Sequence, residues 1–224
     1  MFKTDLHVHT FESSPCCDLP TERIAERYLA AGYTAVAVTD HYTPALRREL
    51  PDIAARVEHL TEGYRRLREL LAGRLHVLFG FELRFFDVAN DYLVYGLTPE
   101  FLLGCPELCE LPRQAAIEKI HAMGGLIYQA HPFRDRMTVL APTGLDGIEI
   151  FNAHNGHDSR NYLAYAFARQ HGLAGIAGSD FHHASNAPSA GILTPDPITS
   201  SEELCAVLRA GTYRTFGEIV PREE

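Results

Sequence analysis

Short apolar runs alternate with longer amphipathic stretches along most of the chain. The runs have strand length and β-branched residues, whereas the longer stretches repeat their apolar positions with helical spacing. The first apolar run predicts a strand that ends within residues 5–9, and the other runs predict strands at 34–39, 75–81, 92–97, 126–130, 147–151, 173–177 and 213–216. The amphipathic stretches predict helices at 21–31, 52–71, 112–123, 159–171 and 202–209. Strands that alternate with helices are typical of a parallel sheet. About seven such units predict an α/β fold, a closed or nearly closed TIM-like (β/α) barrel, in one domain over residues 1–224.

Composition and charge narrow the classes of protein that the chain can belong to. Hydrophobic residues make up 46% of the chain and charged residues 22%, which is typical of globular domains and excludes disordered and fibrous classes. The net charge of −9 argues against a broad basic face, so we expect no long nucleic acid as a partner. No apolar run reaches the roughly 18 residues of a membrane span, and we find no secretion signal. We interpret the five cysteines as reduced thiols. Together with the lack of a membrane span and of a secretion signal, they predict a cytoplasmic protein without a membrane partner.

Histidine and carboxylate side chains gather where the predicted strands end. The chain has 12 histidines. Seven residues of metal-binding type stand at these ends: His7, His9, His41, Glu82, His131, Asp180 and His182. Strand alternation places His7 and His9 on one face and predicts that His131 shares a face with Ile127 and Gln129. Because a parallel barrel builds its site at the carboxyl ends of its strands, we expect the seven side chains to converge.

A metal centre is the simplest physical account of such a cluster. Imidazoles and carboxylates are costly to bury together unless a cation neutralises the acids. Mixed histidine and carboxylate ligation favours zinc, manganese or iron over magnesium or calcium. Seven ligands exceed the four that one tetrahedral ion uses, so at least two divalent ions are expected. Glu82 is the candidate bridge, because one carboxylate can hold two ions about 3.5–4 Å apart.

Five segments in this order resemble the motifs of the PHP (polymerase and histidinol phosphatase) domain. They are Asp5-Leu6-His7-Val8-His9-Thr10, Thr39-Asp40-His41, Gly80-Phe81-Glu82, Ala130-His131-Pro132 and Gly178-Ser179-Asp180-Phe181-His182. The resemblance runs from residue 5 to 182. It implies a distorted (β/α)7 barrel, a centre of two or three metal ions and phosphoester hydrolysis. It also implies that the seven strand-end residues are metal ligands, and we count Glu82 and Asp180 among the catalytic residues as well.

The chain departs from the family pattern at two places. Many members carry Asp or His five or six residues after the second histidine, where this chain has serine and proline. Cys16 is our preferred substitute, because a thiolate is a good zinc ligand, and Cys17 and Asp18 stay open as substitutes. Members also often carry a histidine on the strand near 92–97. Tyr92 holds that place here, with Asp91 as a possible substitute.

Three further residues are expected to line the pocket. His154 follows the strand at 147–151, where family members line their pocket, and we assign it a catalytic role as a ligand, a proton donor or a substrate contact. His183 is a second candidate for the proton donor. Arg84 and Arg134 closely follow two of the predicted ligands. A guanidinium group can bind a phosphate dianion with two hydrogen bonds, so both are predicted to bind substrate.

These features predict a metal-dependent phosphatase, in which a metal-bound hydroxide attacks the phosphorus of a small phosphomonoester or short nucleotide. One alternative is an amidohydrolase, which also begins with His-x-His and breaks C–N bonds. Its binuclear members usually need a carboxylated lysine as bridge, and neither Lys3 nor Lys119 is suitably placed. A nuclease or proofreading phosphodiesterase is a second candidate, and a metal-binding module without catalysis is a third.

Overall fold

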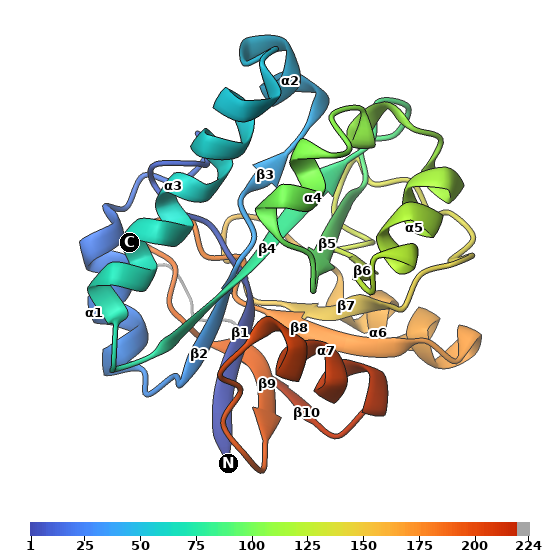
Figure 1. Cartoon of the computed structure of the whole chain (residues 1–224). Coiled ribbons are helices and arrows are strands. Elements are labelled where there is room, and N and C mark those ends of the chain that lie inside the picture. The colour runs from blue at the N-terminus through green and yellow to red at the C-terminus, as the bar shows by residue number, and fades with distance from the viewer. Residues whose placement is uncertain (219–224) are drawn as a thin grey trace.

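Ten strands form one mixed sheet in the computed structural model of the chain, which describes residues 1–218. The strands are β1 (Phe2–Val8), β2 (Ala35–Val38), β3 (His41–Tyr42), β4 (His76–Arg84), β5 (Asp91–Tyr95), β6 (Leu126–Gln129), β7 (Gly147–Asn152), β8 (Ala174–Gly178), β9 (Ala190–Thr194) and β10 (Arg214–Gly217). The helices are α1 (Thr21–Ala30), α2 (Pro44–Glu49), α3 (Ile53–Leu71), α4 (Pro99–Leu103), α5 (Arg113–Ala122), α6 (Asn161–His171) and α7 (Ser201–Ala210), with a short 3-10 helix, η1, at Leu108–Glu110. The helices lie around the outside of the sheet (Figure 1).

The sheet curls until its far strands meet. Its order is β10-β9-β1-β2-β4-β5-β6-β7-β8, and β3 pairs beside β4. Strand β1 also reaches the chain that follows β8, where Val8 pairs with Phe181 and the His9 amide donates to the Phe181 carbonyl at 3.1 Å. This contact brings the ends of β1 and β8 together and nearly closes the barrel. The predicted distorted TIM-like barrel is therefore confirmed.

The expectation of a parallel sheet is wrong for two strands. β5 runs antiparallel to both β4 and β6, and β9 runs antiparallel to β1 and β10. Only residues 85–90 connect β4 to β5, and a parallel connection needs a dozen residues or more. A hairpin is the pairing that so short a connection allows. The strand at 190–194 and the short helices α2 and α4 were not predicted either.

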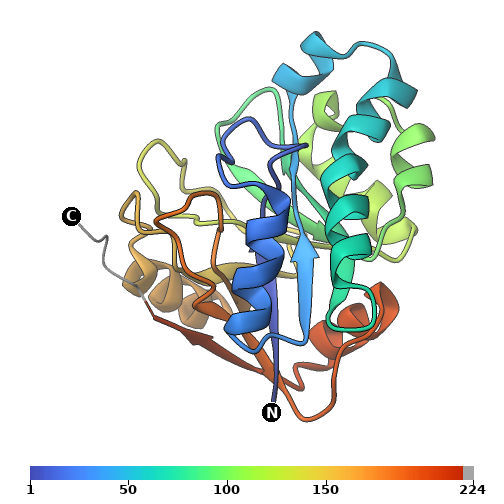
Figure 2. The same cartoon turned by 90° about the vertical axis from the view of Figure 1, so that its left-hand side faces the viewer.

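Two helices cover the outer face of the first strands. α1 and α3 lie side by side (Figure 2), and their apolar residues share one core cluster with β1, β2 and β4, including Tyr28, Val36 and Leu67. The Asp52 carboxylate accepts a hydrogen bond from the Ala55 amide at 2.8 Å and so caps α3 where the sequence predicts its start. No helix within residues 1–218 combines the length and the apolar character that a membrane crossing requires.

Candidate metal centre

Nine side chains of metal-binding type converge at the carboxyl end of the barrel. They form four overlapping groups, in each of which the potential ligand atoms lie within 4.8 Å of one another. The groups are His7–His9–Glu82, His7–His131–Asp180, Glu82–Asp91–His131 and His9–Cys16–His41–His182. All seven strand-end residues and Cys16 are among them, and Asp91 is the ninth.

Hydrogen bonds on the nitrogen that faces away from the centre orient the rings of His7, on β1, and His9, just after β1. His7 Nδ1 lies 3.0 Å from Glu149 Oε1, a carboxylate that can only accept while it is ionised. His9 Nδ1 lies 3.2 Å from Ser14 Oγ, which gives its own proton to Asp40 Oδ1 at 2.6 Å. Both Nδ1 atoms therefore carry hydrogen, and the two Nε2 atoms face each other at 3.1 Å. Two imidazole lone pairs at that distance need a cation between them.

The electrostatics of the centre also fit metal ions. Burial alone would lower the pKa of His7, but the charges of Asp180, Glu149 and Glu82 raise it well above its usual value. Without a metal, a proton on His7 thus supplies the positive charge that the site requires. Buried Glu82 Oε2 lies 3.6 Å from His7 Nε2 and 3.4 Å from His9 Nε2. A carboxylate oxygen and two imidazole nitrogens around one point form a suitable donor set for a divalent transition metal.

Glu82 occupies the middle of the centre. It belongs to two of the four groups, and its Oε1 atom lies 3.2 Å from His131 Nε2 while its Oε2 atom lies 2.9 Å from His41 Nδ1. Burial would raise the pKa of Glu82, but His41 and His7 hold it well below its usual value. The carboxylate is therefore ionised and can serve neighbouring metal positions at once.

Cys16 is the one of the three candidate substitutes that joins the centre. Its Sγ lies 3.2 Å from His41 Nε2. Although burial opposes the shift, hydrogen bonds with His182 and His41 lower the pKa of the thiol to about 7. Cys17 instead turns its sulfur to the carbonyl oxygen of His9, and exposed Asp18 pairs with His183.

Asp91, rather than Tyr92, faces the centre from β5. Tyr92 packs in the outer core. Arg84 donates hydrogen bonds to both carboxylate oxygens of Asp91, from Nε to Oδ1 at 2.6 Å and from Nη2 to Oδ2 at 2.8 Å. Arg134 Nη2 also donates to Asp91 Oδ2, at 3.3 Å. Both predicted substrate-binding arginines therefore lie at the edge of the centre, held by one carboxylate.

Local backbone turns aim two of the nine side chains. His131 and Asp180 both have positive φ angles, 26° and 49°, which are uncommon for residues other than glycine. The predicted face of β6 is wrong, because Ile127 packs in the outer core and Tyr128 points inward with Leu6. His131 reaches Glu82 through the turn in its backbone, and not through strand alternation.

His154 lies beside the nine residues but belongs to none of the four groups. Its ring centroid is 5.3 Å from that of His182. Its Nδ1 accepts a hydrogen bond from the Gly156 amide at 2.8 Å, and burial lowers its pKa to about 3. The ring is therefore neutral near pH 7, with its hydrogen on Nε2.

His157 is a neighbour of the centre that the sequence reasoning missed. Its ring stacks on His154 at 4.4 Å between centroids, and its Nε2 lies 3.7 Å from Asp180 Oδ2. It stands in the loop after β7, five residues beyond Asn152, so no strand-end signal marked it.

The family profile described as PHP-associated matches residues 158–213. This segment holds α6, β8 and the fifth motif with its Asp180 and His182 pair, and the other four motifs precede it in the chain. The chain is therefore similar to the PHP domain family of metal-dependent phosphoesterases in this segment and in its motifs.

Known proteins resemble this chain in sequence or fold. A 5'-3' exoribonuclease of Haemophilus influenzae is 38% identical over a segment that covers 34% of this chain and 30% of that protein, so the match spans about a third of the relative. A protein from Bifidobacterium adolescentis assigned as a metal-dependent phosphoesterase has a TM-score of 0.57 at 15% identity, over 92% of this chain and 96% of its own. A lesion-specific endonuclease from Pyrococcus furiosus has a TM-score of 0.60 at 14% identity, over 96% of this chain and 57% of its own. At these identities the two structures share the fold.

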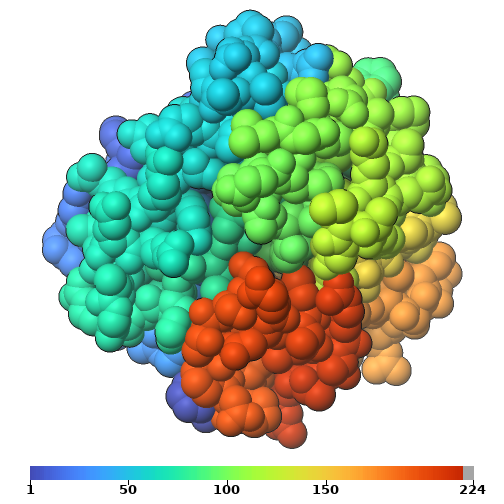
Figure 3. Space-filling model, viewed as in Figure 1, coloured from blue at the N-terminus to red at the C-terminus, as the bar shows by residue number. Residues whose placement is uncertain are grey.

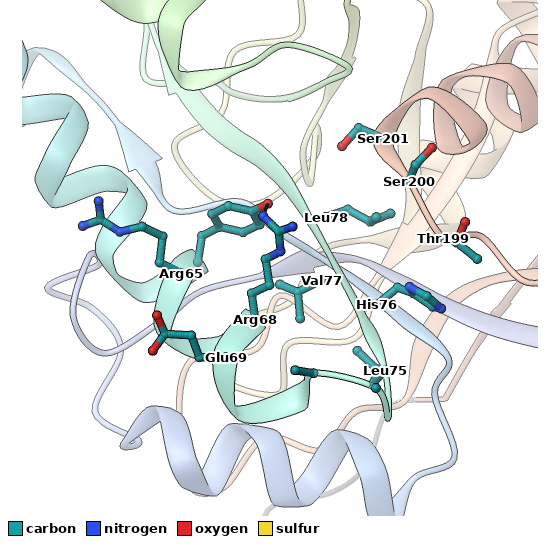
Figure 4. Close-up of a pocket in the computed structure, with 13 residues that line it drawn as sticks. Arg65, Arg68, Glu69, Leu75, His76, Val77, Leu78, Thr199, Ser200 and Ser201 are labelled. Atoms are coloured by element: carbon teal, nitrogen blue, oxygen red, sulfur yellow. Dashed lines mark hydrogen bonds between the residues drawn. The ribbon is translucent and has the colours of Figure 1, made fainter.

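Two cavities lie at opposite ends of the barrel. One, of about 420 Å³, adjoins Cys16 and His41. The other, of about 630 Å³, lies between α3 and α7 at the start of β4, in the hollow visible in Figure 3. Figure 4 shows Arg68 of α3 on one side of this cavity and Ser201 of α7 on the other. Within residues 1–218, all four metal-type groups lie away from this second cavity.

Proposed function

We propose that this PHP domain hydrolyses small phosphate monoesters with two or three divalent transition-metal ions held by the nine-residue cluster. The observation that carries the proposal is the convergence of four ligand groups around Glu82, whose buried Oε2 lies within 3.6 Å of ring nitrogens of His7, His9 and His41. We further propose that residues 1–224 act as one metallohydrolase domain in the cytoplasm. Zinc, manganese and iron are the candidate metals, because the donors are imidazole, carboxylate and thiol groups.

The ligand residues have the arrangement that a hydrolytic centre needs. Divalent ions bound there lower the pKa of a water and neutralise charge on a phosphoryl group. Glu149 and Ser14 keep the Nε2 atoms of His7 and His9 turned toward the ions. Asp180 adds a second carboxylate, 3.4 Å from His7 Nε2, so Glu82 and Asp180 offset the positive charge of the ions.

Arg84 and Arg134 suit the phosphoryl oxygens. Asp91 fixes both side chains at the edge of the centre, and Arg84 uses Nε and Nη2 for that contact. Its Nη1 makes no hydrogen bond with another part of residues 1–218 and is left to donate to a phosphate oxygen. A guanidinium group already held in place loses little entropy when the dianion binds.

His154 is placed to contact the substrate as a neutral ring. Because its Nδ1 accepts the Gly156 amide, the hydrogen on Nε2 can be donated to a phosphoryl or leaving-group oxygen. Its catalytic role, and that of His183 as the second candidate, stays a prediction.

A nuclease is the second candidate function, favoured by the relative named as a 5'-3' exoribonuclease. The net charge of −9 argues for a short nucleotide over a long strand. The amidohydrolase hypothesis is weaker. Lys3 donates to the Ala31 carbonyl at the start of β1, and Lys119 pairs with Glu107 on the outside, so neither of the chain's two lysines can bridge metal ions at Glu82.

A substrate panel tests the proposal. The protein is stripped with a chelator, restored with zinc, manganese or iron, and assayed on phosphate monoesters, a phosphodiester, a 5'-phosphorylated oligoribonucleotide and a set of amides. We expect metal-dependent release of phosphate from the monoesters. Turnover of amides alone, or equal activity in the stripped protein, would overturn the proposal, and turnover of the oligonucleotide alone would favour the nuclease.

A further inference from the structure

The side chains of Glu149 and Asn152 lie together at the end of β7, behind the metal centre. Both are buried, with 1% exposure each. Strand alternation would send residues three apart to opposite faces, but the register of β7 on β8 is irregular. Glu149 lies opposite Ile176, whereas Phe151 lies opposite Ala177. This β-bulge adds one residue to β7, so the two side chains share one face.

Glu149 uses both carboxylate oxygens to hold other residues. Its Oε1 lies 3.0 Å from His7 Nδ1, and its Oε2 accepts a hydrogen bond from the His131 amide at 2.8 Å. Oε2 also accepts from Asn152 Nδ2 at 2.9 Å. A Cβ atom on Gly178 would lie 2.9 Å from Oε1, so β8 packs directly against this carboxylate and fixes its place.

Four partners fix the orientation of the Asn152 side-chain amide. Its Nδ2 donates to Glu149 Oε2 at 2.9 Å and to Asp180 Oδ2 at 3.0 Å. Its Oδ1 accepts from the His154 amide at 3.0 Å and from Ser159 Oγ at 3.2 Å. Because an ionised carboxylate can only accept, the NH2 group of Asn152 must face the two acids. This one amide therefore connects β7 to the residues that follow β8.

Two of the ligands bound to this pair have backbones that need support. His131 and Asp180 have the positive φ angles of 26° and 49°. Such conformations of residues other than glycine persist only where the surrounding structure enforces them. Glu149 holds the amide of His131, and Asn152 holds the carboxylate of Asp180. The pair thus makes a direct contact with each turn that aims one of these ligands.

We propose that Glu149 and Asn152 are positioning residues that together set one metal position, the one formed by His7, His131 and Asp180. These three residues make up one of the four ligand groups, and each has a direct hydrogen bond with the pair. The inference rests on the multi-metal centre of the proposed function. It names the residues that control one ion of that centre.

The metal position that contains Cys16 does not depend on the pair. Its members are His9, Cys16, His41 and His182. Within residues 1–218, every hydrogen bond of the Glu149 and Asn152 side chains goes to a residue outside that group. A change in the pair should therefore empty one position and spare the position of Cys16.

Asn152→Asp separates the effect of position from the effect of charge. The variant keeps the shape of the side chain and its Oδ1 acceptor, but it loses both donated hydrogen bonds and adds a carboxylate beside Glu149 and Asp180. An added negative charge alone would strengthen the binding of a cation, whereas displaced ligands weaken it. We expect the affinity for the ion held by His7, His131 and Asp180 to fall about 10- to 100-fold, the usual cost of losing a residue that orients metal ligands.

Zinc titration against a competing chelator measures these affinities, and anomalous diffraction at the zinc edge locates the ions that remain. Asn152→Asp should hold one ion fewer per chain than the wild type, with the ion missing beside Asp180 and present beside Cys16. Ser159→Ala is the matched control, because it removes one hydrogen bond to Asn152 Oδ1 and leaves both donated bonds intact. This control should keep the metal affinity of the wild type.

A second variant carries the test if circular dichroism shows that Asn152→Asp does not fold. In Glu149→Gln the side-chain oxygen accepts from His131 and Asn152, so the NH2 group faces His7 and donates to Nδ1. The ring hydrogen of His7 is then on Nε2, the nitrogen that faces the centre. We expect this variant to lose the same ion and to keep the ion beside Cys16.

The outcomes separate this inference from the proposed function. Wild-type or tighter zinc binding at the position of Asp180 in a folded variant, or loss of the ion beside Cys16 instead, would overturn the inference alone. A wild type that binds no zinc would overturn the proposed metal centre and the inference together.

Discussion

Three histidines of the centre have a hydrogen-bond partner at Nδ1. In each of them the other ring nitrogen, Nε2, points toward the centre. Glu149 holds His7, Ser14 holds His9, and the Asp180 carbonyl oxygen lies 2.8 Å from His182 Nδ1. Such contacts select one tautomer and raise the basicity of a ligand. The serine that stands where family members carry Asp or His is thus an orienting residue here, and Cys16 is the proposed donor.

The proposed bridging role of Glu82 gives the first prediction. Glu82→Gln keeps the shape but removes the negative charge, and two cations a few ångströms apart repel by several kcal/mol even at an effective dielectric near 20. We expect the variant to lose at least one ion and about 10³ or more in kcat. Phosphatase assays, bound-metal analysis and circular dichroism on both proteins check this. A folded variant with both ions and near-normal turnover would show that another residue bridges.

The exposure of Cys16 gives a second prediction. Cys16 is partly exposed, whereas the other four cysteines, Cys17, Cys105, Cys109 and Cys205, are buried. Iodoacetamide should therefore modify Cys16 first in the metal-free protein, and zinc should slow that reaction by about 10-fold or more, because a coordinated thiolate is shielded. Peptide mass spectrometry gives the rate at each site. Cys16→Ser is the control, and an unchanged Cys16 rate in protein shown to hold its metal would refute thiol ligation.

At the scale of elements, the end of β8 packs tightly against β1. A Cβ atom on Gly178 would lie 2.4 Å from His7 Cβ and 2.9 Å from Glu149 Oε1. Gly178→Ala should therefore push His7 away from Glu149, lower the free energy of unfolding by about 1–3 kcal/mol and reduce metal affinity.

Denaturant unfolding and metal titration check this prediction. Gly104→Ala is the matched control, because the atoms nearest to its new Cβ would be 3.5 Å away, an ordinary contact. Wild-type metal affinity in Gly178→Ala would mean that the position of His7 does not depend on this packing.

The pattern of elements was predictable where local signals decide it. Period-2 apolar runs and capped helices marked β1, β2, β4 and α3 closely, and the strand ends marked the residues that converge. Strand direction depends on connection length and on the partner strand, so β5 and β9 were not assigned correctly. The inward turn of His131 comes from a positive φ that alternation cannot reveal.

The choice between neighbouring candidate ligands depends on tertiary structure and could not be predicted from the sequence. Cys16, Cys17 and Asp18 are neighbours with similar ligand chemistry, and only the loop geometry turns the Cys16 sulfur to His41. Asp91 and Tyr92 are adjacent on β5 and point to opposite faces, so the register of β5 on β4 decides between them.

At the scale of the whole molecule, barrel closure creates the centre. Val8 pairs with Phe181, which places the His7–His9 pair beside Asp180 although the sequence separates them widely. The ligands thus come from both ends of the chain, and a stable centre requires the complete barrel. Metal binding and folding should be coupled for this reason.

Metal content of the purified protein tests the central claim most directly. The chain is stripped, restored with zinc or manganese, freed of excess ion and measured by inductively coupled plasma mass spectrometry against protein concentration. Four overlapping ligand groups around Glu82 predict two or more ions per chain. Well under one ion per chain after restoration with either metal would contradict the multi-metal centre, and with it the proposed phosphoesterase.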